Sequence, residues 1–158
     1  MGVFSLVHLK KRLVTDHQNV SVNELQDWYN RLYAGQHVIW SDGIPDRYCS
    51  ILHNRLTTDF PDALLLDLGS GNGRNAVFFA SSGFRVHAVD FSSVALQQLS
   101  VMAKENKLNI SCEQGDAVYY ATRAPAYNAI LLSLVLHHFN EKHATNFLSD
   151  LHRCCRNG

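Results

Sequence analysis

The sequence lacks an excess of charge of either sign, and it lacks any long apolar run. Its 158 residues carry 14 basic and 14 acidic side chains, which leaves a formal net charge of zero. A basic face of the kind that attracts nucleic acids or membrane surfaces is therefore not expected. No apolar stretch approaches the roughly 20 residues that a helix needs to span a bilayer. We expect neither a nucleic acid nor a membrane among the partners of this chain.

Cysteine is also scarce, and its spacing gives no sign of a metal centre. No Cys-x-x-Cys pair occurs among the four cysteines, which are Cys49, Cys112, Cys154 and Cys155. The adjacent Cys154 and Cys155 are a weak redox or metal candidate, and reduced thiols are the simpler interpretation. His138 and His143 are five positions apart and no third ligand is apparent, so we predict no metal site.

Because the N-terminal apolar segment is too short for a signal-peptide core, we predict a cytoplasmic protein.

What the sequence does contain is the composition and pattern of one α/β domain. Hydrophobic residues make up 46% and charged residues 18%, which is typical of a folded globular chain. Four strand-like apolar runs alternate with helical segments, at residues 64–68, 84–89, 109–113 and 128–133. This alternation predicts a parallel sheet with right-handed crossovers, covered by helices on both faces.

Along the chain we distinguish a leader (1–20), a helical lid (21–60) and a Rossmann-like core (61–158). In the lid, Ser21 and Glu24 form a capping-box pattern that starts a helix. The packing face of that helix is predicted to consist of Leu25, Trp28, Tyr29, Leu32 and Tyr33. A second helix is expected to begin at Pro45, because proline suits the first turn of a helix.

A glycine turn directly follows the first apolar run of the core. Gly69, Gly71 and Gly73 alternate with other residues between a predicted strand and a predicted helix. Glycines in such a turn allow positive φ and a close approach of the backbone to a ligand. Asp90 ends the second apolar run, seventeen residues after Gly73. A carboxylate at that place can accept hydrogen bonds from both hydroxyls of a ribose.

Two residues in and beside this turn indicate which nucleotide-like ligand it holds. A nicotinamide or flavin fold has a third glycine at the sixth position of the motif, where this sequence has Arg74. Asp67 lies in the strand just before the turn, where its negative charge would repel a pyrophosphate and attract an ammonium group. The charges therefore favour S-adenosylmethionine over a dinucleotide. A structural turn without any ligand is the remaining interpretation.

At this point the sequence resembles the class I S-adenosylmethionine-dependent methyltransferases. Four of its segments are similar to their motifs in the right order: 67–75 (DLGSGNGRN), 89–92 (VDFS), 115–117 (GDA) and 132–139 (LSLVLHHF). Within that superfamily, 71–75 (GNGRN) is similar to the tellurite-resistance and thiopurine methyltransferase group. Residues 28–33 (WYNRLY) and 40–45 (WSDGIP) look like the N-terminal signature of those small-molecule enzymes. The fold implied is a Rossmann-like methyltransferase fold.

The resemblance also implies which residues bind S-adenosyl-L-methionine. Asp67 and the carbonyl of Gly69 would hold the methionine ammonium, and Asp90 would hold the ribose hydroxyls. The cofactor would lie against the backbone of the turn, which comprises Gly69, Ser70, Gly71 and Gly73.

The adenine and the reacting sulfonium are assigned in the same way. Phe91 would lie against the adenine, Asp116 would accept from its amino group and the Ala117 amide would donate to its ring. The last part of the cofactor site would be lined by Ser133, Leu134 and Trp40, the last of these in the lid near the sulfonium, where an aromatic face can stabilise a cation. Phe91 and Leu134 could equally be plain core residues.

No catalytic residue is assigned. His137 and His138 follow the strand that points to the reacting centre and are weak candidates for a base, although a helix-entry histidine without a chemical role is the simpler interpretation. The predicted activity is methyl transfer to a small-molecule acceptor. One alternative is a truncated or inactive S-adenosylmethionine-binding module that acts through a partner chain, and another is an NAD-linked oxidoreductase.

The family pattern also leads us to expect about three further strands after residue 158. Without them the fourth strand would be an uncovered sheet edge, and such an edge invites self-association. The sequence therefore predicts either a fragment of a longer protein or a sheet that another chain completes.

Overall fold

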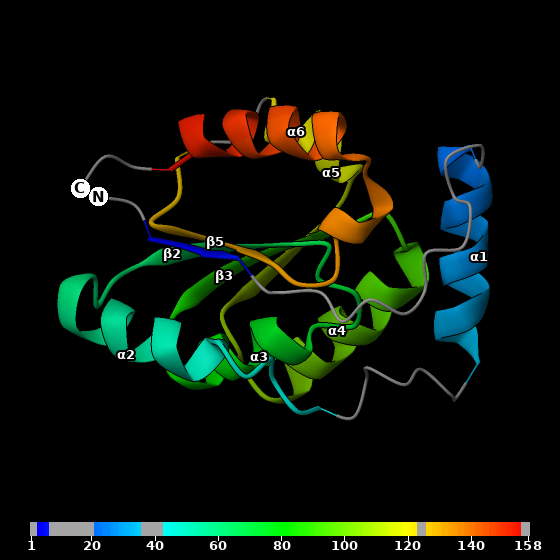
Figure 1. Cartoon of the computed structure of the whole chain (residues 1–158). Coiled ribbons are helices and arrows are strands. Elements are labelled where there is room, and N and C mark those ends of the chain that lie inside the picture. The colour runs from blue at the N-terminus through cyan, green and yellow to red at the C-terminus, as the bar shows by residue number, and fades with distance from the viewer. Residues whose placement is uncertain (1–2, 7–20, 36–42, 123–125, 156–158) are drawn as a thin grey trace.

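Five parallel strands form one sheet in the computed structural model, which describes residues 3–6, 21–35, 43–122 and 126–155 (Figure 1). The four predicted strands are confirmed as β2 (Leu64–Leu68), β3 (Arg85–Asp90), β4 (Ile110–Gln114) and β5 (Ala129–Leu132). A further strand, β1 (Val3–Leu6), lies at the edge, so that the order across the sheet is β1-β5-β2-β3-β4. The α/β Rossmann-like architecture is thus confirmed.

Strand β1 was not predicted, and it changes the expected edge of the sheet. It runs parallel to β5, with Val3 opposite Ala129 and Leu6 opposite Leu132. Our expectation of an uncovered edge at β5 was therefore wrong, because backbone groups of β1 pair with that edge. Residues 3–6, which fall within the predicted leader (1–20), form this strand. The edge strand on that side is now β1 itself, and self-association through the sheet edge stays a prediction.

Helices cover both faces of the sheet (Figure 1). On one face lie α2 (Cys49–Asp59), α3 (Arg74–Ser81) and α4 (Ser93–Glu105), and on the other α5 (Ala117–Ala121) and α6 (Glu141–Arg153). Side chains of β2 point to both faces of the sheet. Leu65 packs in the core between the sheet and helices α2 and α3, whereas Leu66 and Leu68 pack in the core between the sheet and α6. This explains why the strand is apolar at consecutive positions. Among the described residues, no helix is both long and apolar enough to cross a bilayer.

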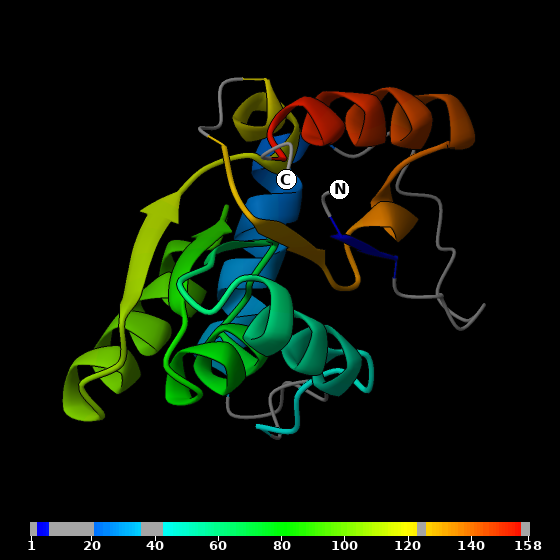
Figure 2. The same ribbon diagram turned by 90° about the vertical axis from the view of Figure 1, so that its left-hand side faces the viewer.

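Helix α1 (Val22–Ala34) stands apart from these two layers, across the carboxyl ends of the strands (Figures 1 and 2). The predicted capping box is confirmed, because Ser21 Oγ accepts from the Glu24 amide and the Glu24 carboxylate accepts from the Ser21 amide. Its predicted packing face was partly wrong. Tyr33 is buried, but the side chain of Trp28 is 45% exposed, since α1 packs on α4 and the glycine turn and not on a broad core.

The second helix begins four residues later than predicted, at Cys49. Asp46 accounts for the delay, because its carbonyl accepts from the Cys49 amide and its side chain from the Tyr48 amide. These bonds form a turn between Pro45 and the helix. The turn holds Asp46 near the start of α3, where its amide donates to Asn75 Oδ1.

Candidate functional site

The direction in which strands are added to the sheet reverses at β2. From β2 the chain adds β3 and β4 on one side, and then crosses to β5 on the other side. In open parallel sheets, ligands bind outside the carboxyl ends of the strands at such a switch point. The predicted glycine turn follows β2, and Ser133 and Leu134 follow β5. The fold therefore brings these two groups of predicted residues to the two sides of the switch point.

Hydrogen bonds tie the glycine turn to the end of β3. The amides of Gly69 and Ser70 donate to the Val89 carbonyl at 2.7 and 3.1 Å, and the Gly71 amide donates to Asp90 Oδ2 at 2.8 Å. Gly69 and Gly71 have φ values of 75° and 55°, which agree with the predicted need for left-handed backbone. The turn is thus fixed to the end of β3, which carries Asp90, the residue predicted to bind the ribose.

The protein's own side chains use the space that the glycines leave open. A Cβ on Gly69 would lie 2.3 Å from Cγ2 of Val135, and a Cβ on Gly71 would lie 2.2 Å from the Tyr33 hydroxyl. Gly73 precedes α3 with φ 90°. We predicted that these glycines leave space for a ligand. They also leave space for Tyr33 of α1 and for Val135 of the turn after β5, a role that the motif alone did not indicate.

Asp67 is a buried carboxylate that accepts no hydrogen bond from the part of the chain that the structure describes. Its side chain is 1% exposed, and neither oxygen accepts a hydrogen bond from a described residue. Burial raises the pKa of Asp67 to about 7, and the nearby negative charge of Asp90 acts in the same direction. The polar N–H of the Ala76 backbone and the positive charge of Arg74 oppose this pKa rise, although no hydrogen bond from that N–H to the carboxylate is formed. A buried carboxylate in this condition is a ready partner for a cation or a hydrogen-bond donor.

Asp90, by contrast, is already bonded inside the protein. Its two oxygens accept from the amides of Gly71 and Ser92, each at 2.8 Å, and its side chain is buried. Burial raises the pKa of Asp90, and these amides counteract the rise. Each carboxylate oxygen has two lone pairs, so the group retains capacity for further donors. Asp90 thus both holds the turn and remains chemically suited to ribose hydroxyls.

The residues predicted to contact adenine lie at the end of β4 and after β3. Asp116 is half-buried and caps α5, its Oδ1 accepting from the amides of Val118 and Tyr119. Ala117, the first residue of α5, is half-buried. Phe91 is half-buried as well, with its ring centroid 5.3 Å from that of Tyr29 on α1. Phe91 is therefore not a core residue.

Sequence reasoning missed how α1 covers this region. Tyr33 lies over Gly71, as described above, and Tyr29 lies between Phe91 and His138, with its hydroxyl 3.0 Å from His138 Nε2. Asn30 fixes the helix to the start of α4, because its Oδ1 accepts from the Ser92 hydroxyl at 2.7 Å. The signal available was the spacing of two tyrosines four residues apart, which places both on one face.

A second missed group surrounds Arg74. Its guanidinium donates to Ser133 Oγ at 3.2 Å and lies 4.0 Å from Oδ2 of Asp46. Asn75 is buried, and its Oδ1 accepts from the Asp46 amide and from the Cys49 thiol. Arg74 thus connects the lid segment to the end of β5. The departure of Arg74 from the dinucleotide motif was the one signal for this role.

The remaining predicted residues follow β5 or fall in the lid. His137 and His138 belong to a short 3-10 helix (Leu136–His138), and their ring centroids are 3.9 Å apart. Leu134 is 42% exposed and has φ 60°, so it is not a core residue. Trp40 lies outside the described residues.

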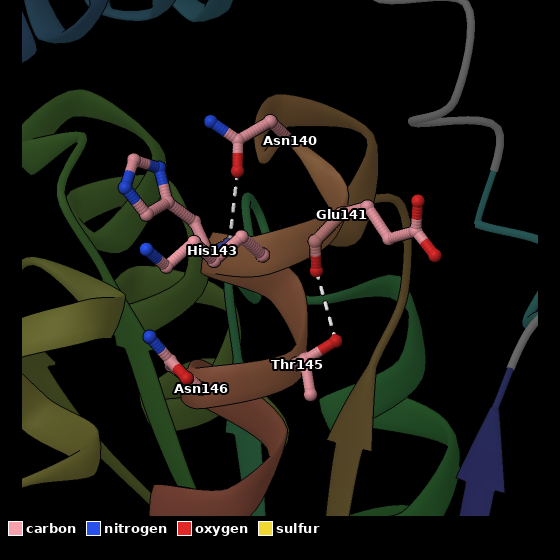
Figure 3. Close-up of a pocket in the computed structure, with 6 residues that line it drawn as sticks. Asn140, Glu141, His143, Thr145 and Asn146 are labelled. Atoms are coloured by element: carbon pink, nitrogen blue, oxygen red, sulfur yellow. Dashed lines mark hydrogen bonds between the residues drawn. The ribbon is translucent and has the colours of Figure 1, made fainter.

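A polar hollow at the start of α6 lies apart from these residues (Figure 3). Its hydrogen bonds belong to the helix itself, since Asn140 caps the His143 amide and the Thr145 hydroxyl donates to the Glu141 carbonyl. It contains none of the predicted site residues. Within the part of the chain that the structure describes, no group of three or more His, Cys, Asp or Glu is arranged to hold a metal ion.

Comparison with protein families shows to which family the chain belongs. A family model described as a methyltransferase domain matches residues 65–158, from the first residues of β2 to the end of the chain. The chain belongs to this methyltransferase family. The match includes all the segments on which the resemblance to class I methyltransferases rested, and that interpretation is confirmed. No curated protein matches the sequence.

Solved structures with the same fold are methyltransferases in several cases. The structure reported for the conversion of a disulfide bond into a thioacetal group during echinomycin biosynthesis has a TM-score of 0.73 and 23% identity, covering 85% of this chain and 56% of that one. TehB from Haemophilus influenzae has a TM-score of 0.61 and 19% identity, covering 84% and 42%. Magnesium protoporphyrin IX methyltransferase (ChlM) from Synechocystis PCC 6803, with bound SAM, has a TM-score of 0.66 and 17% identity, covering 92% and 74%.

These likenesses show the fold of this methyltransferase domain. The chain spans about half the length of the first two of these structures. The activity and the substrates of those larger proteins are therefore a matter for proposal here.

Proposed function

We propose that this chain is an S-adenosylmethionine-dependent methyltransferase that acts on a small-molecule acceptor. The observation that carries the proposal is Asp67, a buried carboxylate with no hydrogen-bond partner among the described residues, at the switch point of a methyltransferase-family sheet. A buried charge without a partner is costly, so a protein keeps one where a ligand completes it. The ammonium group of S-adenosylmethionine supplies such a partner.

The other residues present fit the same ligand. Asp90 and Asp116 lie at the ends of the next two strands beyond β2, in the order in which a ribose and an adenine would follow a methionine moiety. Each of these carboxylates keeps lone pairs for further donors. On α1, Tyr33 presents its hydroxyl at the glycine turn. We infer that Tyr33 and Tyr29 cover the bound cofactor and exclude water from it.

When bound, S-adenosylmethionine supplies a methyl group already activated by a sulfonium. The residues of the chain then have to hold donor and acceptor close together and in line. Positioning of this kind can lower a barrier by about 7 kcal/mol or more in favourable cases. A soft nucleophile such as a thiolate needs no base, and the lack of an assigned base is consistent with such an acceptor.

The small size of the acceptor is inferred from α1. The helix crosses the carboxyl ends of the strands, where a polymer substrate would have to lie (Figure 2). Among proteins of the same fold, ChlM is by name a magnesium protoporphyrin IX methyltransferase, which is an enzyme of a small molecule. The NAD-linked alternative gains no support, because Asp67 would repel a pyrophosphate.

Calorimetric titration of the chain with S-adenosylmethionine, S-adenosylhomocysteine and NADH tests the proposal, together with transfer of a labelled methyl group to a panel of small thiols. We expect both adenosyl compounds to bind and NADH not to bind. Binding without any transfer would favour the S-adenosylmethionine-binding module that acts through a partner. Binding of NADH in the absence of S-adenosylmethionine binding would contradict the proposal.

A further inference from the structure

Leu134 has an unfavourable backbone conformation in an exposed place. Its φ is 60°, and Lys107 is the one other non-glycine residue with positive φ in the described part of the chain. The left-handed region is disfavoured for residues other than glycine, asparagine and aspartate. The side chain of Leu134 is 42% exposed, so burial of that side chain does not compensate for the strain.

The two neighbours of Leu134 impose this conformation. Ser133 is buried and its Oγ accepts from the Arg74 guanidinium at 3.2 Å. Val135 is buried too, and it packs so closely on the glycine turn that a Cβ at Gly69 would lie 2.3 Å from its Cγ2. Because both neighbours are fixed inward, the residue between them is turned outward. Strain of this kind persists where the surrounding structure determines it, and such places cluster at functional sites.

The position of Leu134 relative to the three carboxylates suggests what its side chain meets. Asp67, Asp90 and Asp116 belong to the ends of β2, β3 and β4, which all lie on one side of the switch point. Leu134 follows β5, on the other side. If the proposed function holds, the adenosyl end of the donor extends toward β4 and its methionine end lies at β2, next to β5. The side chain of Leu134 then lies beyond the donor, at the side open to an acceptor.

We propose that Leu134 selects the methyl acceptor, and that the acceptor presents an apolar face to this side chain beside its nucleophilic atom. This inference rests on the proposed function. An exposed leucine gains free energy when an apolar group covers it, and it gains little from a polar or charged group. The backbone of residues 133 and 134 borders the donor, whereas the Leu134 side chain contacts the second substrate.

Two thiols of opposite character serve as acceptor probes: thiophenol, which is apolar, and 2-mercaptoethanol, which is polar. In each transfer the thiolate sulfur forms a bond to the methyl carbon while the carbon–sulfonium bond breaks, so that S-adenosylhomocysteine leaves with that electron pair. We expect the wild-type chain to have the higher kcat/KM for thiophenol. Leu134→Asn keeps a residue that tolerates positive φ but removes the apolar group. It should reduce the preference for thiophenol about tenfold.

Three further variants separate selection from strain and from general loss of apolar surface. Lys107→Gly relieves the other left-handed residue, after α4, and Ile51→Asn removes another exposed apolar side chain, on α2. Both should leave the thiol preference unchanged. Leu134→Gly should lose the preference while its melting temperature stays at or above that of the wild type, because glycine is not strained at this φ.

The readouts distinguish the two proposals. If S-adenosylhomocysteine binds every variant with similar affinity but Leu134→Asn keeps the wild-type thiol preference, the role of Leu134 is overturned and the proposed function stands. A wild-type chain that binds S-adenosylhomocysteine yet methylates neither thiol, or both equally, also overturns it. A wild-type chain that does not bind S-adenosylhomocysteine overturns the proposed function instead.

Discussion

The hydroxyl of Tyr29 lies 3.0 Å from Nε2 of His138, and this hydrogen bond joins α1 to the segment after β5. Burial raises the pKa of Tyr29, so the phenol is neutral and available as a donor. We predict that Tyr29→Phe weakens S-adenosylhomocysteine binding a few-fold and lowers stability by about 1 kcal/mol, the usual effect of one lost hydrogen bond. Tyr48→Phe is the matched control, since the Tyr48 hydroxyl bonds to the adjacent Arg47. Calorimetry and urea unfolding measure the two effects, and equal behaviour of both variants would contradict a role for this contact.

We expect Asp67 to lower the stability of the folded chain at neutral pH, because burial raises its pKa. Its pKa is about 7 when folded and starts from 3.8, so the unfolded chain releases the proton first as pH rises from 3.8 to 7. Stability therefore falls across that window and stays low above it. The difference corresponds to about 4 kcal/mol at most. We predict that Asp67→Asn is more stable than the wild type in urea unfolding at pH 8, with a smaller difference at pH 4.

The exposed Asp62 offers the control for that comparison. Asp62→Asn should unfold like the wild type at both pH values. An Asp67→Asn variant less stable than the wild type at pH 8 would show that Asp67 has a stabilising partner. The same variant should bind S-adenosylhomocysteine more weakly, since an amide cannot neutralise an ammonium.

Cofactor binding should also release a proton from Asp67. An ammonium beside this carboxylate favours its ionised form, so below pH 7 binding must first displace the proton. We predict that S-adenosylhomocysteine binds about tenfold more tightly at pH 7.5 than at pH 5.5. Calorimetry in buffers with different heats of ionisation counts the protons released. An affinity independent of pH, with no proton release, would remove Asp67 from the ammonium site.

Gly71 and Gly83 allow the contact between α1 and the turn to be measured. Both have positive φ, but a Cβ at Gly83 meets nothing within 4 Å, whereas one at Gly71 meets the Tyr33 hydroxyl at 2.2 Å. Gly83→Ala should cost about 1 kcal/mol through the backbone alone. Gly71→Ala should cost more and should weaken S-adenosylhomocysteine binding, because α1 has to shift. Addition of Tyr33→Phe should restore part of the loss, and no restoration would locate the strain elsewhere.

The features that the sequence predicted depend on neighbours along the chain. The capping box at Ser21 and the positive φ of Gly69 are set by a few adjacent residues. Strand β1 was missed because it is four residues long and its partner, β5, lies more than a hundred positions away. Long-range contacts of single side chains leave no periodic signal either.

The residues of the candidate site also fall into those that could be predicted from the sequence and those that could not. The carboxylates Asp67 and Asp90 could be predicted because they end strands beside a glycine turn. The contacts of Tyr29 with His138 and of Arg74 with Ser133 could not, since each joins residues that only the finished fold brings together. Leu134 shows a further limit of prediction from the sequence. The sequence left open whether Leu134 lines the cofactor or packs in the core, and its side chain is 42% exposed in the structure, between two buried neighbours.

A network of polar groups on the face of the sheet that α5 and α6 cover supplies a last test, this one of stability. His87 Nδ1 lies 2.7 Å from the Tyr127 hydroxyl and 3.1 Å from that of Tyr120, and its Nε2 lies 3.3 Å from the Glu113 carboxylate. Burial lowers the pKa of His87, although Glu113 opposes this. As pH falls below about 6.5, the unfolded chain takes up the proton first, so stability is lost in that range. His87→Gln should weaken this dependence between pH 7 and pH 5, measured by thermal unfolding. The exposed His152→Gln should keep it. If the wild type and His87→Gln lose stability in parallel, another group is responsible for the acid sensitivity.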